Sequence, residues 1–275
     1  MGLEVKREIW TLTGEKTSVR SDALAVEEPL EIRINSQAIT TTMRTPGHDL
    51  ELTLGWLFGE GIISSLEDLM GLEPDPNDEN VVLVRLRDGL ESSIEPRQFG
   101  SGSACGVCGK TSLEQIHARG LKRITNSAQV TARVLYRLPN ALREVQTTFD
   151  STGGLHAAAL FTLEGGLLAV REDVGRHNAV DKLIGLSRLQ NLSLEDSIML
   201  VSGRVGFEIA QKCVAARVPI LAAVGAPSSL AVDLALEFNL ILIGFLRGER
   251  ANVYSGFDRF LSIPARDSVS GTKTL

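Results

Sequence analysis

The stretch Ser197-Ile-Met-Leu-Val-Ser-Gly-Arg204 begins the pattern that decides the fold. Its first five residues are an apolar run typical of a buried strand, and small and charged residues then precede a helical apolar periodicity through Phe207 and Val214. The same order of apolar strand, loop and helix recurs at residues 219–237, and a third apolar run fills residues 240–245. This repeat predicts right-handed crossover units and a largely parallel sheet of the α/β class.

The loops after these three strands carry the candidate binding residues. Ligands of open α/β sheets bind beyond the carboxyl ends of the strands. Arginine makes bidentate contacts with phosphate, and small residues at a helix start offer backbone N–H donors. We therefore expect a phosphate-bearing ligand at Ser202, Gly203 and Arg204, at Ala226, Pro227 and Ser228, and at Phe245, Arg247 and Arg250. No Walker loop or G-x-G-x-x-G motif is present, so an ordinary kinase or dinucleotide dehydrogenase is not expected.

A polar segment, residues 171–185, lies between predicted apolar elements. If residues 178–189 form a helix, Ala179, Val180, Leu183 and Leu186 make its apolar face, and His177 lies among the polar groups at its N-terminus, a ready anion site. Solvated charge is the ordinary explanation of such a segment. Because the segment carries both signs of charge, we prefer a polar site between core elements.

The first half of the chain predicts a smaller mixed β domain. Residues 30–42 suggest a hairpin, Pro46-Gly47 a turn before a helix that begins at His48 or Asp49, residues 73–80 a surface loop, and residues 81–86 a strand. Arg44, His48 and Asp49 either bind an anion or form a satisfied polar cluster. Residues 90–94 are expected to form a strand, 113–121 a short helix and 132–144 another, which Pro139 should interrupt. We expect domains at 1–104 and 148–275, with a cysteine loop and linker helices at 105–147.

Two thiols, Cys105 and Cys108, lie in a run of Gly and Ser residues that leaves a sulfur accessible. A zinc site would need two more ligands, and the chain offers only Cys213 and isolated histidines. A thioredoxin-like pair usually has a bulkier neighbour and opens a helix after a strand. Two thiols with no role are a further alternative, but a nucleophilic or sulfur-carrying role is favoured. Cys213 is expected in the core of a helix.

Composition limits the class of protein. The net charge is −6, so nucleic acid is not an expected partner. The N-terminus does not resemble a signal peptide, and no apolar window is long enough for a membrane span. An odd count of three cysteines favours a reducing, cytoplasmic setting over a disulfide scaffold.

Seven motifs together carry a family resemblance, and they run in order from residue 43 to residue 254: MRTPGHDLELTLGWLFGEGII, SACGVCGK, TGGLHAAAL, REDVGRHNAVDKLIG, SGRVGFEIAQKC, GAPSSLAVDLA and GFLRGERANVY. The chain resembles the FdhD family, the sulfur carriers required for formate dehydrogenase activity. The resemblance implies a cytidine-deaminase-like α/β C-terminal domain and a homodimer. It also implies that the protein accepts persulfide sulfur from a cysteine desulfurase. That sulfur then passes to the molybdenum of bis-molybdopterin guanine dinucleotide, before the cofactor enters apo formate dehydrogenase.

The resemblance also implies roles for individual residues. Cys105 matches the persulfide-bearing thiol and Cys108 the second thiol, while Lys110 nearby favours the thiolate. The family binds guanine nucleotides in place of the cofactor's GMP portions, through a loop that matches Phe245, Leu246, Arg247, Gly248, Glu249 and Arg250.

Two positions differ from the family pattern, because Gly206 and Gly225 stand where serine is expected.

Glu172, Asp173 or Asp181 are candidates to accept a hydrogen bond from guanine. The alternatives from other classes are a chaperone that binds and protects the molybdenum cofactor without carrying sulfur, and a thiol redox enzyme. No resident metal is expected, because the zinc signature of the deaminases is missing.

Overall fold

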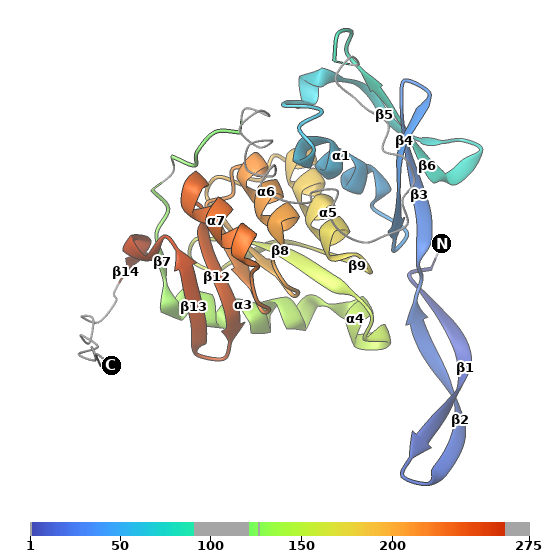
Figure 1. The fold of residues 1–275 in the computed structure, drawn as a ribbon. Coiled ribbons are helices and arrows are strands. Elements are labelled where there is room, and N and C mark those ends of the chain that lie inside the picture. The colour runs from blue at the N-terminus through green and yellow to red at the C-terminus, as the bar shows by residue number, and fades with distance from the viewer. Residues whose placement is uncertain (1, 91–120, 126, 262–275) are drawn as a thin grey trace, which may run out of the picture.

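A computed structural model describes residues 2–90, 121–125 and 127–261 (Figure 1). Cys105 and Cys108 lie outside these residues, as do most of the strand expected at 90–94 and of the helix expected at 113–121. In the part of the chain that is described, no helix is long and apolar enough to cross a membrane.

The C-terminal domain is built on a six-stranded sheet in the order β13-β12-β11-β10-β8-β9. The strands are β8 (His156–Thr162), β9 (Leu167–Asp173), β10 (Ser197–Val201), β11 (Ile220–Ala223), β12 (Ile241–Arg247) and β13 (Arg250–Ser255). Within this sheet, parallel pairs form only between β10 and β11 and between β11 and β12. Strand β9 runs in the same direction as these three but is separated from β10 by the antiparallel β8. The α/β class is confirmed, but a largely parallel sheet was wrong, because the tight turns at Gly165-Gly166 and Gly248-Glu249 join β8 to β9 and β12 to β13 as antiparallel hairpins.

Helices cover both faces of this sheet (Figure 1). On one face lie α5 (Arg176–Leu189), α6 (Phe207–Ala216) and α7 (Ser229–Phe238), and on the other lies α3 (Ala132–Val145), followed by the short α4 (Thr147–Thr152). Successive side chains of β10 point to opposite faces of the sheet. Met199 packs in the core under α5, α6 and α7, and Ile198 packs in the core under α3. The three strands and two helices predicted for the repeat are confirmed as β10, β11, β12, α6 and α7.

Helix α3 continues through Pro139 without a break, so the expected interruption was wrong. Leu135, Leu138 and Leu142 are buried on one side of α3, against the sheet. Their burial stabilises a continuous helix despite the missing N–H of proline. Helix α3 falls within the segment expected to hold linker helices, and its leucines belong to the core of the C-terminal domain.

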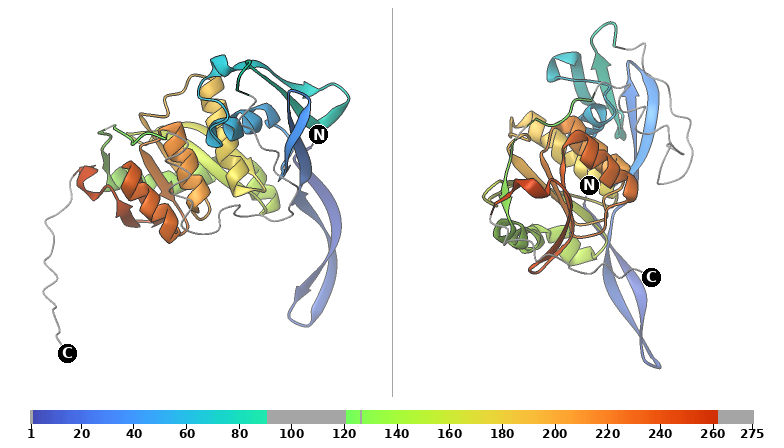
Figure 2. Two further views of the ribbon diagram at one scale, coloured as in Figure 1. Left: turned by 45° about the horizontal axis from the view of Figure 1, so that its top comes forward. Right: turned by 60° about the vertical axis from the view of Figure 1, so that its left-hand side comes forward.

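The N-terminal domain is a four-stranded sheet in the order β4-β3-β6-β5, covered by α1 (Asp49–Gly59) (Figure 2). Its strands are β3 (Glu28–Ile34), β4 (Gln37–Arg44), β5 (Leu69–Asp75) and β6 (Asp78–Leu86). The hairpin over 30–42 is confirmed, with positive φ at Asn35 and Ser36. The surface loop expected at 73–80 was wrong. These residues form the β5–β6 hairpin, and Pro74 is accommodated because β5 is an edge strand.

Short elements and one long ribbon complete the chain. Two-residue strands β7 (Val130–Thr131) and β14 (Phe260–Leu261) pair in parallel, and single 3₁₀ turns cover Leu66–Asp68 and Phe257–Arg259. Strands β1 (Glu4–Thr13) and β2 (Lys16–Ala25) form a separate antiparallel ribbon that extends away from both domains (Figure 1).

The two domains meet where α1 lies directly on α5. A Cβ added at Gly55 would overlap the carbonyl group of Asp181, and one added at Gly185 would overlap the carbonyl group of Glu51. The two helix backbones therefore touch at two glycines. Beside this contact Glu51 makes two hydrogen bonds with the Arg171 guanidinium, at 2.5 and 2.8 Å.

Two buried ion pairs flank the same junction. The Lys182 ammonium lies 2.7 Å from Asp173 Oδ2 and also donates to the Thr45 carbonyl at 2.7 Å. Asp173 additionally accepts from the backbone N–H groups of Thr45 and Gly175 and from the Asn178 side chain. In the second pair, Lys212 contacts Asp181 at 2.8 Å. Burial of these charges is tolerated because each has a partner.

We predict that Gly185→Ala destabilises the protein by about 2 kcal/mol or more, because the new methyl group forces α1 and α5 apart. The substitution should otherwise favour the helix, so the loss isolates the interhelix contact. Urea unfolding measures the loss in the free energy of unfolding. Gly154→Ala is the control, because a Cβ at Gly154 would make only ordinary van der Waals contacts. Equal stability of the two variants would contradict the close approach.

Replacing Lys182 by Met should cost about 3–5 kcal/mol, because Asp173 would remain buried without its cation. The matched control is Arg85→Met, which breaks an exposed pair with Glu73 and should cost less than about 1 kcal/mol. Urea unfolding measures the free energy of unfolding of both variants. Comparable losses would show that the buried Lys182–Asp173 pair contributes no more to stability than an exposed pair.

Candidate functional site

The carboxyl ends of β10, β11 and β12 meet at one edge of the sheet, as expected for parallel strands. Backbone hydrogen bonds tie the loops together: Gly225 N–H donates to the Gly203 carbonyl at 3.1 Å, and Phe245 N–H to the Gly225 carbonyl at 3.0 Å. Val205 N–H likewise donates to the Ala226 carbonyl at 3.1 Å. We call this edge, with the loops at 202–206 and 224–228, the carboxyl edge.

The two glycines that depart from the family pattern differ in their surroundings. A Cβ at Gly225 would lie 2.7 Å from the Gly203 carbonyl oxygen, so the backbone leaves no room for a side chain there. At Gly206 nothing lies within 4 Å of such an atom. Of the two positions, only 206 therefore has room for a serine side chain and its hydroxyl contact.

The third loop was expected at residues 246–250, and this expectation was wrong. Leu246 and Arg247 still belong to β12, Gly248 and Glu249 form the turn, and Arg250 begins β13. The Leu246 side chain is buried in the core, so only its backbone is available to a ligand. The Arg247 guanidinium approaches the carboxyl edge, where its Nε donates to the Val224 carbonyl at 3.2 Å.

Phe245 is turned outward by a break in the register. The β12–β13 pairing shifts between Gly244 and Arg247, and Phe245 has a φ of 52°. A positive φ is unusual for a bulky residue and marks strain that often serves a function. The result is an aromatic side chain that is 41% exposed beside Gly225.

Three helices begin at this edge, after the ends of β9, β10 and β11. Within the described residues, the N-termini of α5 and α6 have no side-chain cap, whereas Ser228 caps α7 through the N–H of Ala231. Backbone N–H groups at helix starts attract anions. The exposed side chains of Arg204, Arg247 and Arg250 add positive charge nearby, so the carboxyl edge is suited to phosphate.

Two histidines belong to the same edge. A Cβ at Gly203 would lie 3.2 Å from His156 Nδ1, so the imidazole lies against this loop. His177, in the first turn of α5, has its Nε2 atom 3.4 Å from Glu208 Oε2. Burial lowers the pKa of both imidazoles, and that of His177 falls to about 4 although Glu208 opposes the shift. Both side chains are therefore neutral near pH 7.

Sequence reasoning included His177 but missed His156 and Glu208. The only local signal for His156 is its place between a glycine pair and an apolar strand, and Glu208 simply follows Phe207 at the start of a helix. Their grouping depends on the pairing of β8 with β10, which brings distant segments together.

The three acidic residues considered for guanine each have partners within the protein. Glu172 accepts the backbone N–H groups of Thr148 and Phe149 at the start of α4. Asp173 and Asp181 are buried in the ion pairs of the domain junction. The polar segment at 171–185 thus lies between core elements as expected, but its carboxylates hold the structure together.

Arg44 also has a structural role. Its guanidinium is buried and makes two hydrogen bonds with Asp49, at 3.0 and 3.1 Å, and one with Asn80 at 2.9 Å. This is the satisfied polar cluster that was one of the two interpretations.

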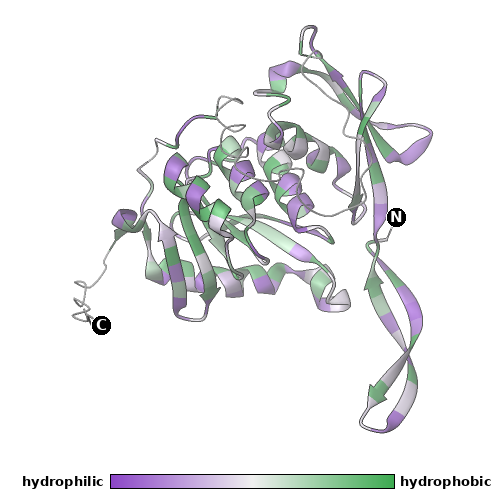
Figure 3. Cartoon of the chain, viewed as in Figure 1, coloured by the Kyte–Doolittle hydropathy of each residue, from purple (hydrophilic) through white to green (hydrophobic). Residues whose placement is uncertain are grey.

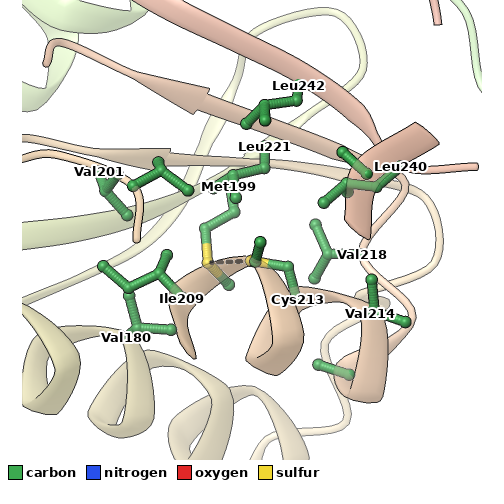
Figure 4. Close-up of a cluster of buried hydrophobic side chains, with 14 of the residues drawn as sticks. Val180, Met199, Val201, Ile209, Cys213, Val214, Val218, Leu221, Leu240 and Leu242 are labelled. Atoms are coloured by element: carbon green, nitrogen blue, oxygen red, sulfur yellow. Dashed lines mark hydrogen bonds between the residues drawn. The ribbon is translucent and has the colours of Figure 1, made fainter. Parts of the chain in front are cut away.

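Cys213 lies in the core between α6 and the sheet, as predicted (Figure 4). Its Sγ atom is 3.6 Å from Met199 Sδ, and its side chain has no exposed surface. Burial raises the pKa of this thiol well above its usual range. Cys213 is therefore unsuited to nucleophilic chemistry, and Cys105 and Cys108 are the other thiols of the chain.

Cavities occur away from the carboxyl edge. One, of about 190 Å³, lies at the domain junction and is lined by residues that include Leu3, His48 and Lys182. Another, of about 520 Å³, lies beside β7 and the start of α3. Among the residues placed by the structure, no group of three His, Cys, Asp or Glu side chains is arranged to hold a metal ion.

Comparison with known proteins places the chain in a family. A sulfur carrier protein FdhD of Mycolicibacterium paratuberculosis is 48% identical over 273 residues, which covers 94% of this chain and 99% of that protein. The FdhD of Streptomyces coelicolor is 49% identical over 268 residues, covering 92% of this chain and 94% of the relative.

A solved structure from Desulfotalea psychrophila, described as a formate dehydrogenase accessory protein, has the same fold. Its TM-score is 0.77 at 23% identity, and the match covers 94% of this chain and all of that chain. The sequence model of the FdhD/NarQ family matches residues 25–261. The chain therefore belongs to the FdhD/NarQ family.

Proposed function

We propose that this protein carries sulfur for formate dehydrogenase, with Cys105 as the thiol that receives it from a cysteine desulfurase. The observation that carries the proposal is the family match over residues 25–261, which includes both thiols of the C-x-x-C pair. The relatives bear the name sulfur carrier protein. Burial of Cys213 supports the assignment, because it leaves Cys105 and Cys108 as the thiols suited to transfer.

The loading step is a thiol–persulfide exchange. The Cys105 thiolate attacks the outer sulfur of the desulfurase persulfide, the sulfur–sulfur bond breaks, and the desulfurase cysteine leaves as a thiolate. In the delivery step a second thiol, the role proposed for Cys108, attacks the inner sulfur of the Cys105 persulfide. A Cys105–Cys108 disulfide forms, and the electron pair of the broken sulfur–sulfur bond leaves with the outer sulfur as hydrosulfide. The hydrosulfide replaces an oxo ligand of the substrate molybdenum, and its proton and the proton lost by the Cys108 thiol leave with the oxo group as water.

The substrate proposed for the carboxyl edge is bis-molybdopterin guanine dinucleotide, for which guanine nucleotides serve as mimics. Arg204, Arg247 and Arg250 bind its phosphates, together with the N–H groups at the starts of α5 and α6. The exposed ring of Phe245 offers a stacking surface for guanine. Neutral His177 is able to donate one hydrogen bond and accept another. The remaining contacts come from the small-residue loops: Ser202, Gly203, Ala226, Pro227, Gly248, Glu249 and the backbone of Leu246.

The remaining parts of the proposal concern assembly and location. The partners are the desulfurase and apo formate dehydrogenase, the protein acts as a homodimer in the cytoplasm, and the C-terminal domain is of the cytidine-deaminase-like type. The mixed six-stranded sheet with helices on both faces is compatible with that description.

Sulfur loading is tested by intact-protein mass spectrometry after incubation with a cysteine desulfurase and cysteine. The wild type and Cys213→Ala should gain the mass of about one sulfur atom, removable by a reductant, because both retain the Cys105 thiolate that is the proposed nucleophile. Cys105→Ala should gain none. An unmodified wild type, or a Cys105→Ala variant that still supports active formate dehydrogenase, would favour a cofactor chaperone.

Nucleotide binding is tested by calorimetry with GDP. Arg247→Ala should weaken binding more than tenfold, because a phosphate contact at the carboxyl edge is lost. Arg143→Ala, which removes an exposed guanidinium beside α4, is the control and should bind GDP as the wild type does. Equal affinities of the two variants would remove Arg247 from the site.

A further inference from the structure

The β1–β2 ribbon is long and stands apart from the sheets. Its pairing runs without a shift from Glu4 opposite Ala25 to Thr13 opposite Lys16, and neither strand pairs with another described strand. Figures 1 and 2 show it extending beyond the C-terminal domain. An isolated two-stranded hairpin is at best marginally stable in water, so a ribbon of this length is expected to be covered.

One face of the ribbon's outer half is apolar. Residues directly opposite each other point to the same face, so Trp10 and Val19 lie side by side, with Leu12 and Thr17 next to them. Trp10 is 72% exposed, Leu12 75% and Val19 45%. Figure 3 shows this alternation of apolar and polar residues along the ribbon. We call Trp10, Leu12, Thr17 and Val19 the ribbon patch.

The opposite face at the same level is more polar. Thr11, Ser18 and Arg20 lie there, and Ile9, opposite Arg20, is half-buried. The Arg20 side chain donates to Thr11 Oγ1 at 3.0 Å and contacts Asp22 at 3.3 Å. The ribbon patch is therefore the more apolar and more exposed face of the outer half.

The inner half is already partly covered by the protein itself. Gly154, just after α4, approaches Ala25, because a Cβ on this glycine would lie 3.7 Å from the Ala25 Cβ. Ala23 and Ala25 are half-buried. Glu4, Lys6, Glu8 and Ser21 on this face are exposed but charged or polar, so the ribbon patch is its exposed apolar part.

Bulk and charge on this face are divided between the two strands. Strand β1 contributes large or charged residues and β2 contributes small uncharged ones, so that the rows pair as Glu4 with Ala25, Lys6 with Ala23, Glu8 with Ser21, Trp10 with Val19 and Leu12 with Thr17. Two such faces are complementary if β1 of each ribbon lies over β2 of the other. No charge then faces a like charge.

We propose that the ribbon patch binds the ribbon patch of a second copy of this chain, related by a two-fold axis through the patch. Trp10 then packs on the partner's Val19 and Leu12 on the partner's Thr17, and each contact occurs twice. A second copy of this chain presents the matching arrangement of large residues on β1 and small residues on β2 by symmetry. The same arrangement gives no reason to expect an unrelated protein as the partner. This inference names the surface of the homodimer and rests on that part of the proposed function.

Sedimentation measures the mass of the wild type and of Trp10→Ser/Leu12→Ser at micromolar concentration. The wild type should sediment at twice the chain mass of 29.7 kDa and the patch variant at 29.7 kDa. The control is Met70→Ser/Leu236→Ser, which removes two exposed apolar side chains elsewhere and should stay dimeric. Because the ribbon patch lies outside all three cores, the patch variant should still fold, with the far-UV circular dichroism spectrum of the wild type and a cooperative thermal transition.

A cross-linking experiment tests the register in a Cys105→Ser/Cys108→Ser background. Chains carrying Leu12→Cys, mixed with chains carrying Thr17→Cys and treated with a bis-maleimide about 10 Å long, should form covalently linked pairs, because stacked sheets lie about 10 Å apart. The control replaces Thr17→Cys by Ser18→Cys, which lies on the opposite face and should give at least tenfold fewer pairs.

The outcomes separate this inference from the function on which it rests. A patch variant that remains dimeric, or equal cross-linking in the two mixtures, overturns the ribbon interface and leaves a homodimer through another surface. A monomeric wild type overturns the interface and the homodimer together. A monomeric patch variant that still acquires sulfur on Cys105 supports the interface and places sulfur loading on the single chain.

Discussion

Direct backbone contact between α1 and α5 is the constraint on which the rest of the structure depends. Gly55 and Gly185 leave no side chain between the two helices, so the N-terminal domain lies close against the C-terminal one. Only at that separation can Lys182 reach both Asp173 and the carbonyl of Thr45. The junction is thereby closed around charges that would be costly to bury without partners.

This arrangement explains what the sequence could and could not predict about the polar segment at 171–185. Charges of both signs between apolar elements indicated buried partners, and that much was correct. The identity of the partners depends on Thr45 and Glu51, more than a hundred residues away in the chain, which no local pattern reveals. The carboxylates that seemed available to a ligand were therefore already used.

Local signals were sufficient for most individual elements. The apolar runs predicted β10, β11 and β12, and the turn at Asn35-Ser36 predicted the hairpin of β3 and β4. They failed where a longer-range effect decided the outcome. Burial of three leucines kept α3 intact across Pro139, and β12 continued past Phe245 because β13 pairs with it. The antiparallel additions at both sides of the sheet likewise depend on turn length, which a repeat of apolar runs does not record.

The candidate site consists of the groups that these constraints leave available to a ligand. Most buried charges of the described chain are paired in the junction or at a helix start, and the reactive character of Cys213 is suppressed by burial. Binding capacity remains at the carboxyl edge, where two helix starts lack side-chain caps and an aromatic ring is held outward in a strained conformation. A rigid junction leaves that edge open while fixing the strands that shape it. The protein thus separates the groups that stabilise the fold from those proposed to meet a phosphate-bearing substrate. The strain at Phe245 can persist because the hydrogen-bonded loops around Gly225 hold it.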